Sequence, residues 1–204
     1  MRFESNKAML VGAVALLLAV GPAAARADKP VPAPASSSEK GAVAEPAAPE
    51  AGPRAEFLGD YAAVTDKILQ LADAIPAEKY TWRPQAGVRS VSEVLLHASG
   101  GSYFFPTFLG VAMPAGIDPK ALETSTTEKA KVIETLRASV AYGRGVVLRM
   151  TDADLEKTGK FFGGRQATYR VMITSLAEHC HEHLGQLIAY ARMNAVTPPW
   201  SKTD

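Results

Sequence analysis

The sequence predicts an all-α protein whose folded part is a four-helix bundle. Apolar residues recur at steps of three and four in four long segments, which is the spacing of a helix with one buried face. Serine stands three residues before glutamate at two candidate helix starts, and no convincing series of strands interrupts the pattern. Four long amphipathic helices, with one long connection over residues 106–123, are typical of such a bundle.

The N-terminus has the features of a secretory signal. Arg2 and Lys7 precede an uncharged, mostly apolar run over residues 8–20, and Ala25 and Ala27 have the spacing that a signal peptidase recognises. We therefore predict a signal peptide over residues 1–27 and a periplasmic or secreted product. The apolar run is shorter than the roughly 20 residues of a membrane helix, so we expect no stable membrane span after cleavage. An uncleaved anchor is the alternative.

Residues 28–53 follow as a segment dominated by Pro, Ala, Ser and Glu, without an aromatic residue. Such a composition buries too little apolar area to offset the entropy of ordering the chain, so we predict a disordered linker. One folded domain over residues 54–200 remains, which is near the common domain size.

The composition argues against a nucleic-acid partner. The 204 residues are 47% hydrophobic and 21% charged, with a formal net charge of +1. Cleavage of the signal removes three positive charges and one negative charge, which leaves a mature chain near −1 and gives no reason to expect a nucleic-acid partner. The single cysteine, Cys180, cannot form an intramolecular disulfide, and we expect it to be buried. The sequence leaves a homodimer open.

The first helix is predicted over about residues 55–74, and Pro76 ends it. Its apolar stripe consists of Phe57, Leu58, Tyr61, Val64, Ile68 and Leu71. The connector over residues 77–89 contains proline and glycine, so we expect an irregular segment across the end of the bundle. The second helix should begin with a capping box formed by Ser90 and Glu93 and run to about Phe105. His97 follows Val94 by three residues and can face inward.

The third helix is predicted after Ser125-Thr126-Thr127-Glu128, which repeats the capping-box spacing. Its apolar positions are Ile133, Leu136, Val140, Val147 and Met150. A short turn at residues 151–154 and a loop or weak hairpin over residues 157–166 should come next. The last helix is predicted to begin near Thr168 and to end before Pro198, with Cys180 in its apolar stripe.

Three of the four histidines lie in residues 179–183, on the last predicted helix. His179 and His183 are four residues apart, so both side chains project from one helix face and can share one metal ion. His97 completes a trio if the second and last helices pack side by side. Catalytic zinc, nickel or iron sites commonly use three protein ligands and keep a position for water or substrate. We therefore predict a divalent metal ion (zinc, nickel or iron) at His97, His179 and His183.

Other interpretations of this segment remain. The histidines can also be surface residues, satisfied core groups or adventitious metal binders. A zinc-protease H-E-x-x-H motif would need a histidine where Gly185 stands. Cys180 as a nucleophile is a weaker hypothesis, because adjacent helical residues diverge by about 100°. Glu178 and Glu182 are candidate acceptors for imidazole N–H groups, although exposed carboxylates are the simpler interpretation.

Two further points concern a di-iron motif and a group of aromatic residues. The E-x-x-H motif of di-iron bundles occurs once, and its required second copy is absent. Trp82, Phe104 and Phe105 are candidates for the lining of a substrate pocket, with core packing as the default explanation.

With the histidines placed, the sequence resembles the DinB-like superfamily of four-helix bundles, which includes thiol-dependent transferases. The matching segments are Tyr80–Pro84 (YTWRP), Gly87–His97 (GVRSVSEVLLH) and His179–Gln186, which has the form H-x-x-x-H-x-G-Q. The resemblance covers about residues 55–197. It implies a metal centre with one histidine from the second helix and two from the last, close helix approach at Gly185 and a hydrogen bond from Gln186 near the site.

The resemblance also bears on activity. It implies a small-molecule substrate, with a low-molecular-weight thiol as cosubstrate that the metal would activate. The export signal departs from that pattern and puts a cytosolic thiol in question. Our leading expectation is an exported metal-dependent transferase or hydrolase that activates a thiol or water, with no residue identified as the general base. The alternative is a non-catalytic metal-binding or stress-related interaction protein of the cell envelope.

Overall fold

The computed structural model describes residues 45–201. The predicted signal peptide and residues 28–44 of the predicted linker lie outside the described residues. Residues 45–52 carry no helix or strand, and Pro53, which we had assigned to the linker, begins the first helix. Among the described residues, no helix combines the length and apolar composition that a membrane span requires.

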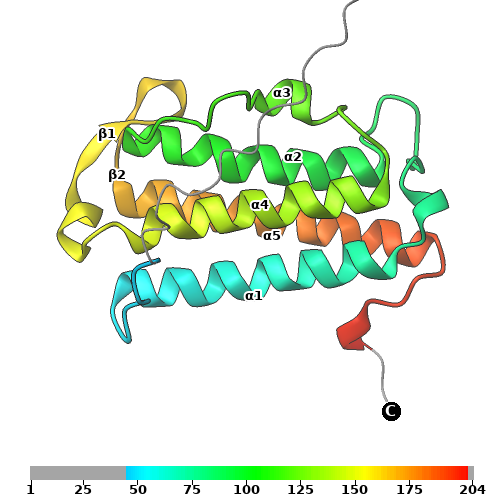
Figure 1. Ribbon diagram of the computed structural model, residues 1–204, viewed down its shortest axis with the longest axis horizontal. Helices are drawn as coiled ribbons and strands as arrows, with labels where there is room; N and C mark the ends of the chain where they lie inside the picture. Colours follow the sequence, from blue (N-terminus) through cyan, green and yellow to red (C-terminus); the bar gives the residue numbers. More distant parts are fainter. Residues whose placement is uncertain (1–44, 202–204) are drawn as a thin grey trace, which may run out of the picture. The chain divides into compact units, whose positions relative to one another are not determined.

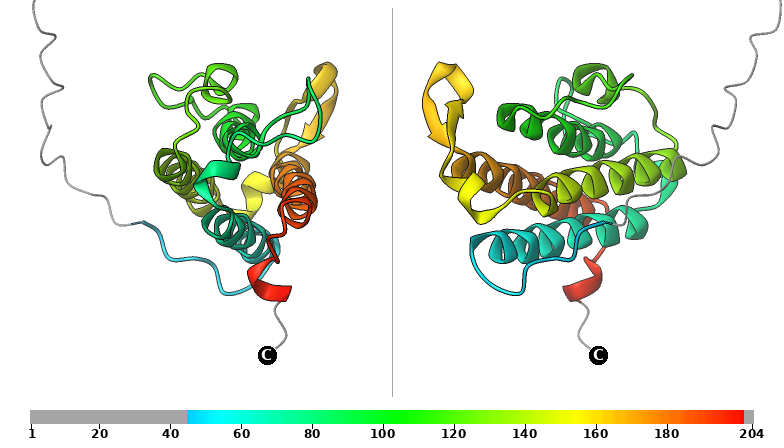
Figure 2. Two further views of the ribbon diagram at one scale, coloured as in Figure 1. Left: turned by 90° about the vertical axis from the view of Figure 1, so that its right-hand side faces the viewer. Right: turned by 60° about the vertical axis from the view of Figure 1, so that its left-hand side comes forward.

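Four long helices form the bundle, and their bounds agree with the predicted ones to within a few residues (Figure 1). They are α1 (Pro53–Ala74), α2 (Val91–Phe104), α4 (Lys129–Leu148) and α5 (Tyr169–Met193). Each of α1 and α2 packs against both α4 and α5, so that the four helices surround one core (Figure 2). The predicted all-α bundle is confirmed for the described part of the chain.

The core contains the apolar stripes that the sequence predicted. Ile68 and Leu71 of α1 are fully buried, as are Leu136 of α4 and Leu187 of α5. Cys180 is 1% exposed, which confirms the prediction that it is a core residue. Burial of each such aliphatic side chain stabilises the fold by about 1.5–3 kcal/mol relative to leaving it exposed.

The two predicted capping boxes have different outcomes. At α2 the Glu93 N–H donates to Ser90 Oγ (3.3 Å) and the Ser90 N–H donates to Glu93 Oε2 (2.7 Å), which confirms the first. The second, at residues 125–128, is wrong, because Glu128 itself is the N-cap of α4 and makes no side-chain cap. Instead, Lys129 Nζ donates to the backbone carbonyls of Asp73 (2.7 Å) and Ile75 (2.8 Å), which ties the start of α4 to the end of α1.

Short elements occupy the connections. The residues between α2 and α4 include a 3₁₀ turn (Phe105–Leu109) and the one-turn helix α3 (Pro119–Leu122), neither of which we predicted. The predicted turn at Thr151 is confirmed as a capped 3₁₀ segment (Asp152–Glu156). The predicted weak hairpin is also confirmed, as the antiparallel strands β1 (Thr158–Lys160) and β2 (Gln166–Thr168).

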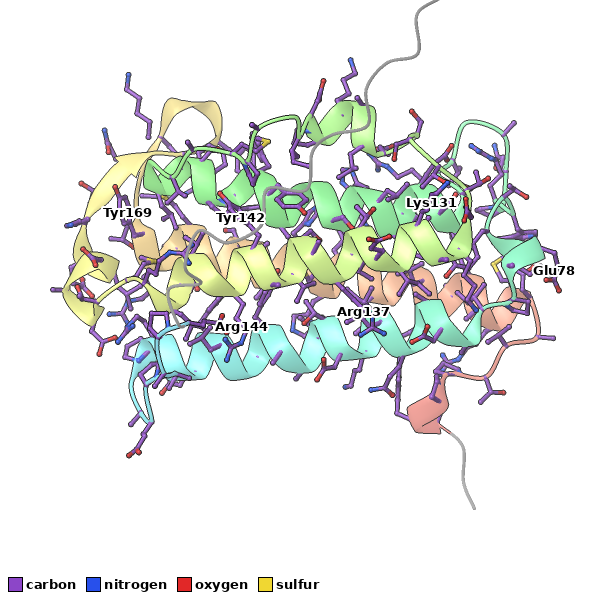
Figure 3. The ribbon with its side chains drawn as sticks, viewed as in Figure 1. Glu78, Lys131, Arg137, Tyr142, Arg144 and Tyr169 are labelled. Carbon is purple, nitrogen blue, oxygen red and sulfur yellow. The ribbon has the colours of Figure 1, made fainter. Side chains whose placement is uncertain are left out.

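Charged side chains of α4 face the neighbouring α1 and the segment that precedes it. Arg137 pairs with Asp73 (3.4 Å) and Arg144 pairs with Glu45 (3.1 Å) (Figure 3). These pairs are largely exposed, so each contributes about 1 kcal/mol or less. The predicted histidines lie on the other side of the bundle, on α2 and α5.

Candidate metal centre

The structure brings the three predicted histidines together. His97 lies on α2, and His179 and His183 lie one turn apart on α5, which packs against α2. The Nε2 atom of His179 is 3.2 Å from Nε2 of His97 and 3.2 Å from Nε2 of His183. One nitrogen from each ring falls within 4.8 Å of the others. Three rings from two helices therefore point at one small volume.

Two of the three separations match the spacing of ligands around one ion. Zinc–nitrogen bonds of about 2.0–2.1 Å place two ligand nitrogens roughly 2.9–3.4 Å apart at octahedral or tetrahedral angles. Both measured Nε2–Nε2 distances of 3.2 Å lie inside that interval. The residues present therefore fit a divalent metal ion, whose identity the geometry does not select among zinc, nickel and iron.

Hydrogen bonds on the outer edges of two rings point their Nε2 lone pairs toward the shared volume. His97 Nδ1 lies 2.9 Å from Glu123 Oε2, and His183 Nδ1 lies 3.0 Å from Gln186 Oε1. Because an ionised carboxylate and an amide oxygen can only accept, each Nδ1 carries the proton. In a neutral imidazole the other nitrogen is then an acceptor, which is the form that binds metal.

His179 has a different environment. Its Nδ1 is buried without a hydrogen-bond partner, and its ring lies against Gly101 of α2. Burial, followed by the neighbouring His183 and His97, lowers the pKa of His179 to about 3. Burial also lowers the pKa of His183. Both rings are therefore neutral at ordinary pH, which is the form of histidine that binds a metal cation.

Gly101 makes the close approach of His179 to α2 sterically feasible. A Cβ atom at position 101 would lie 2.5 Å from Cε1 and 2.6 Å from Nδ1 of His179, well inside van der Waals contact. Glycine in a helix interior costs about 1 kcal/mol relative to alanine. At this position the imidazole ring of His179 occupies the space that a side chain would fill.

Arg89 supports His97 through Glu123. The Arg89 guanidinium donates to both carboxylate oxygens of Glu123, at 2.7 and 3.2 Å, and the same carboxylate accepts from His97. Burial alone would raise the pKa of Glu123, but the hydrogen bonds from Arg89 and His97 outweigh it and lower that pKa. Glu123 therefore stays ionised and holds the His97 ring in one tautomer.

A second chain of hydrogen bonds supports His183 and returns to Arg89. Gln186, which accepts from His183, donates through Nε2 to the hydroxyl of Tyr190 (2.9 Å). The Tyr190 hydroxyl donates in turn to the backbone carbonyl of Arg89 (3.0 Å). Two of the three imidazoles are thus oriented by partners that both contact Arg89, so that the segment just before α2 is tied to α5.

Glu123 and Arg89 are the supporting residues that we missed from sequence. Glu123 follows α3, whose start is signalled locally by Asp118 before Pro119: the Asp118 carboxylate accepts from the Lys120 N–H (2.9 Å). Proline at the first helical position after an aspartate N-cap is a recognisable pattern. Only the tertiary fold, however, places Glu123 beside His97, 26 residues away.

Other candidates fall outside the trio. His181 is exposed and lies 3.1 Å from Asp60. Glu178 and Glu182 are exposed, so the interpretation of both as solvated carboxylates holds and the imidazole acceptors are Glu123 and Gln186 instead. Burial raises the pKa of the Cys180 thiol to about 12, which argues against a nucleophile.

Two expectations about packing also need correction. Gly185 does not mediate close helix approach, because a Cβ there would meet nothing within 4 Å and the residue is exposed. Trp82 packs edge-on against Tyr190, with ring centroids 5.3 Å apart, and does not line the cavity beside the histidines. Phe104 and Phe105, in contrast, do line it.

A cavity of about 460 Å³ opens directly beside the centre, bounded by α2, α3 and the β1–β2 connection. Its walls include the rings of His97 and His179 and the carboxylate residue Glu123. Its remaining lining residues are Gly100, Gly101, Phe104, Phe105, Pro119, Lys120 and Phe162. The cavity is within the size range of small-molecule sites.

Comparisons with known proteins agree with this architecture. The sequence profile of the DinB superfamily matches residues 60–187. The fold is similar to the crystal structure of a DinB-like protein from Bacillus cereus, with a TM-score of 0.61 and 19% sequence identity. That match covers 70% of this chain and 93% of the other. No curated protein matches the chain.

Proposed function

The chain belongs to the DinB superfamily, and from this premise we propose that it is an exported, metal-dependent transferase or hydrolase whose ion is held by His97, His179 and His183. The observation that carries the proposal is the convergence of three Nε2 atoms, with two separations of 3.2 Å, at the wall of a cavity. When bound, the ion would act as a Lewis acid that makes a thiol or a water molecule nucleophilic near neutral pH.

The open side of the centre favours an enzyme over a structural metal site. Structural zinc sites are usually closed by four protein ligands, whereas catalytic sites keep a position for water or substrate. Among residues 45–201, the three histidines are the one cluster of candidate metal ligands, and no fourth side chain joins them. Two of the three rings border the cavity, which gives a small molecule direct access.

The supporting residues orient the rings. Glu123 and Gln186 fix the tautomers of His97 and His183, and the buried surroundings keep His179 neutral. Glu123 is the carboxylate residue that lines the cavity, but its pairing with Arg89 makes it a poor proton acceptor. We therefore assign it an orienting role and leave the catalytic base unassigned.

Metal analysis of the mature protein tests the proposal. We expect about one divalent ion per chain in the wild type, and its loss in His97→Ala and His183→Ala. His181→Ala is the matched control, because His181 lies in the same helix but bonds to Asp60, and it should retain the ion. Tight, stoichiometric metal in folded His97→Ala would refute the three-histidine centre.

Export is a separate part of the proposal. The support for it is the sequence of residues 1–27. N-terminal sequencing of the protein recovered from each cell fraction tests it. Mature protein outside the cytoplasm that begins at about residue 28 is the expected result; cytoplasmic protein with an intact N-terminus would contradict export.

A further inference from the structure

We propose that the cavity beside the three histidines binds a small aromatic carboxylate, with its ring against the phenylalanine side chains of the wall and its acidic group at Lys120. This inference rests on the proposed function, because it names the class of substrate that would lie next to the metal centre. The supporting observations are the aromatic walls and the balance of charge among the lining residues.

The base of the cavity lies where two neighbours pack against consecutive glycines of α2. Gly100 and Gly101 are consecutive on α2 and both line the cavity. A Cβ at Gly100 would lie 3.3 Å from Pro119, and one at Gly101 would overlap His179. The two glycines therefore let Pro119 and the His179 ring pack closely against α2, so that a proline ring and an imidazole ring form the base of the cavity.

Aromatic rings form the walls. Phe104 and Phe105 end α2 and begin the following turn, and Phe162 reaches them from the β1–β2 connection, beside the C-terminal end of α2 (Figure 2). The Phe162 ring centroid lies 6.1 Å from that of Phe104 and 5.7 Å from that of Phe105. Aromatic rings prefer such tilted and edge-on contacts. The aromatic ring of a ligand can therefore make the same kind of contact with these three phenylalanines.

Two of these rings are more exposed than packing alone explains. Phe162 is 48% exposed and Phe104 is 37% exposed, and they are two of the four large hydrophobic side chains exposed among the described residues. Both face the same cavity. An apolar ligand that covers these rings would remove apolar surface from water, which stabilises the complex by about 25 cal/mol for each Å² buried.

The charges at the rim favour an anion. The lining has one carboxylate, Glu123, and one ammonium group, Lys120. The charge of Glu123 is balanced by Arg89, and His97 donates a hydrogen bond to it, whereas Lys120 is exposed and makes no ion pair within the described residues. A single lysine is a point charge, which matches a singly charged group such as a carboxylate. Phosphates are usually held by arginine forks or several backbone N–H groups.

Calorimetry with two isosteric probes, 2-naphthoate and neutral 2-naphthamide, tests the proposal on the mature protein. One 2-naphthoate should bind per chain. Lys120→Met should raise its Kd about threefold, as for a partly exposed ion pair, and leave the Kd of 2-naphthamide unchanged. Phe162→Ser should raise the Kd of both probes about tenfold, because it removes apolar contact.

Matched controls are available on the same chain. Lys131 is an exposed lysine on α4 that does not line the cavity, and Met193, 63% exposed, is the last residue of α5. Lys131→Met and Met193→Ser should bind both probes as the wild type does. Circular dichroism of every variant establishes that the bundle remains folded.

Three results would overturn the inference: failure of 2-naphthoate to bind the wild type with a Kd below about 1 mM, an equal effect of Lys120→Met on both probes, or no effect of Phe162→Ser. Metal analysis of the same samples separates this inference from the proposed function. Stoichiometric metal without probe binding refutes only the ligand class. Lysine-dependent binding of 2-naphthoate to protein that never holds metal refutes only the metal centre.

Discussion

Replacing Gly101 with alanine should expel His179 from the metal centre while the bundle remains folded. The new Cβ would lie 2.5 Å from Cε1 and 2.6 Å from Nδ1 of the imidazole. Because such atoms normally stay about 3.5–4.0 Å apart, the ring must move by about 1 Å. Metal sites tolerate ligand displacements of only about 0.2 Å. We therefore expect at least a tenfold to hundredfold loss of metal affinity, the range for disturbed ligand orientation.

The effect of Gly101→Ala on folding should be modest. Alanine gains about 1 kcal/mol of helix propensity over glycine, and crowding a packed site costs about 1–3 kcal/mol. The free energy of unfolding of the metal-free protein should therefore change by about 2 kcal/mol or less. Titration with a competing chelator measures metal affinity, and denaturant unfolding of the metal-free protein measures stability.

Gly185→Ala is the matched control for this experiment. Gly185 is also helical, but a Cβ there meets nothing within 4 Å. The Gly185→Ala variant should gain up to about 1 kcal/mol in the free energy of unfolding and keep the metal affinity of the wild type. If Gly101→Ala binds metal as tightly as Gly185→Ala does, then the contact between Gly101 and His179 is not what positions the ring, and the reasoning fails.

Three further predictions concern other parts of the molecule. Arg89→Lys loses the two-pronged contact with Glu123, so chelator titration should show metal affinity about tenfold to hundredfold lower; unchanged affinity would exclude this support. Cys180, buried with a raised pKa of about 12, should resist alkylation by iodoacetamide at pH 8 until the protein unfolds, as mass spectrometry can follow; rapid labelling of folded protein would contradict its core position. Burial alone would raise the pKa of Glu93, but the hydrogen bonds from the Ser90 N–H and other donors outweigh burial and lower that pKa. The ionised carboxylate therefore stabilises the fold at pH values above its ordinary pKa of 4.5, and this stabilisation is lost as the pH falls below that value and through the lowered pKa. Glu93→Gln should therefore cost about 0.3–1.5 kcal/mol near pH 7 by denaturant unfolding and much less near pH 3; a constant difference between the two pH values would show that the ionised carboxylate is not responsible.

Local patterns predicted most of the fold because the helices are amphipathic and bounded by strong signals. The stripe of α5 places Cys180 and Leu187 in the core, and proline and capping residues mark where helices begin and end. The capping box at α2 was predictable because both partners lie within four residues of each other. Such interactions depend only on neighbours in the chain.

The same reasoning fails where a distant contact decides the local structure. Residues 125–128 have the same serine–glutamate spacing as the start of α2, yet α4 begins at Lys129. There the Lys129 ammonium binds carbonyl groups at the end of α1, and Val132 is fully buried one turn later. Tertiary packing therefore outweighs a weak local cap.

The candidate site shows the same division. The spacing of His179 and His183 was readable from the chain, and the capped helix at Ser90 placed His97 near the buried side. The roles of Glu123, Arg89 and Gly101 were not readable, because each depends on a contact between residues that are distant in sequence. Sequence alone thus predicted the histidine trio and, through the family resemblance, a hydrogen bond at Gln186, but not the roles of Glu123, Arg89 and Gly101.

X-ray absorption at the metal edge of the protein as purified tests the central claim most directly. The three-histidine centre predicts three imidazole nitrogens at about 2.0–2.1 Å for zinc, together with an exchangeable oxygen ligand on the open side. Fewer than three imidazoles or the absence of a bound metal would contradict it.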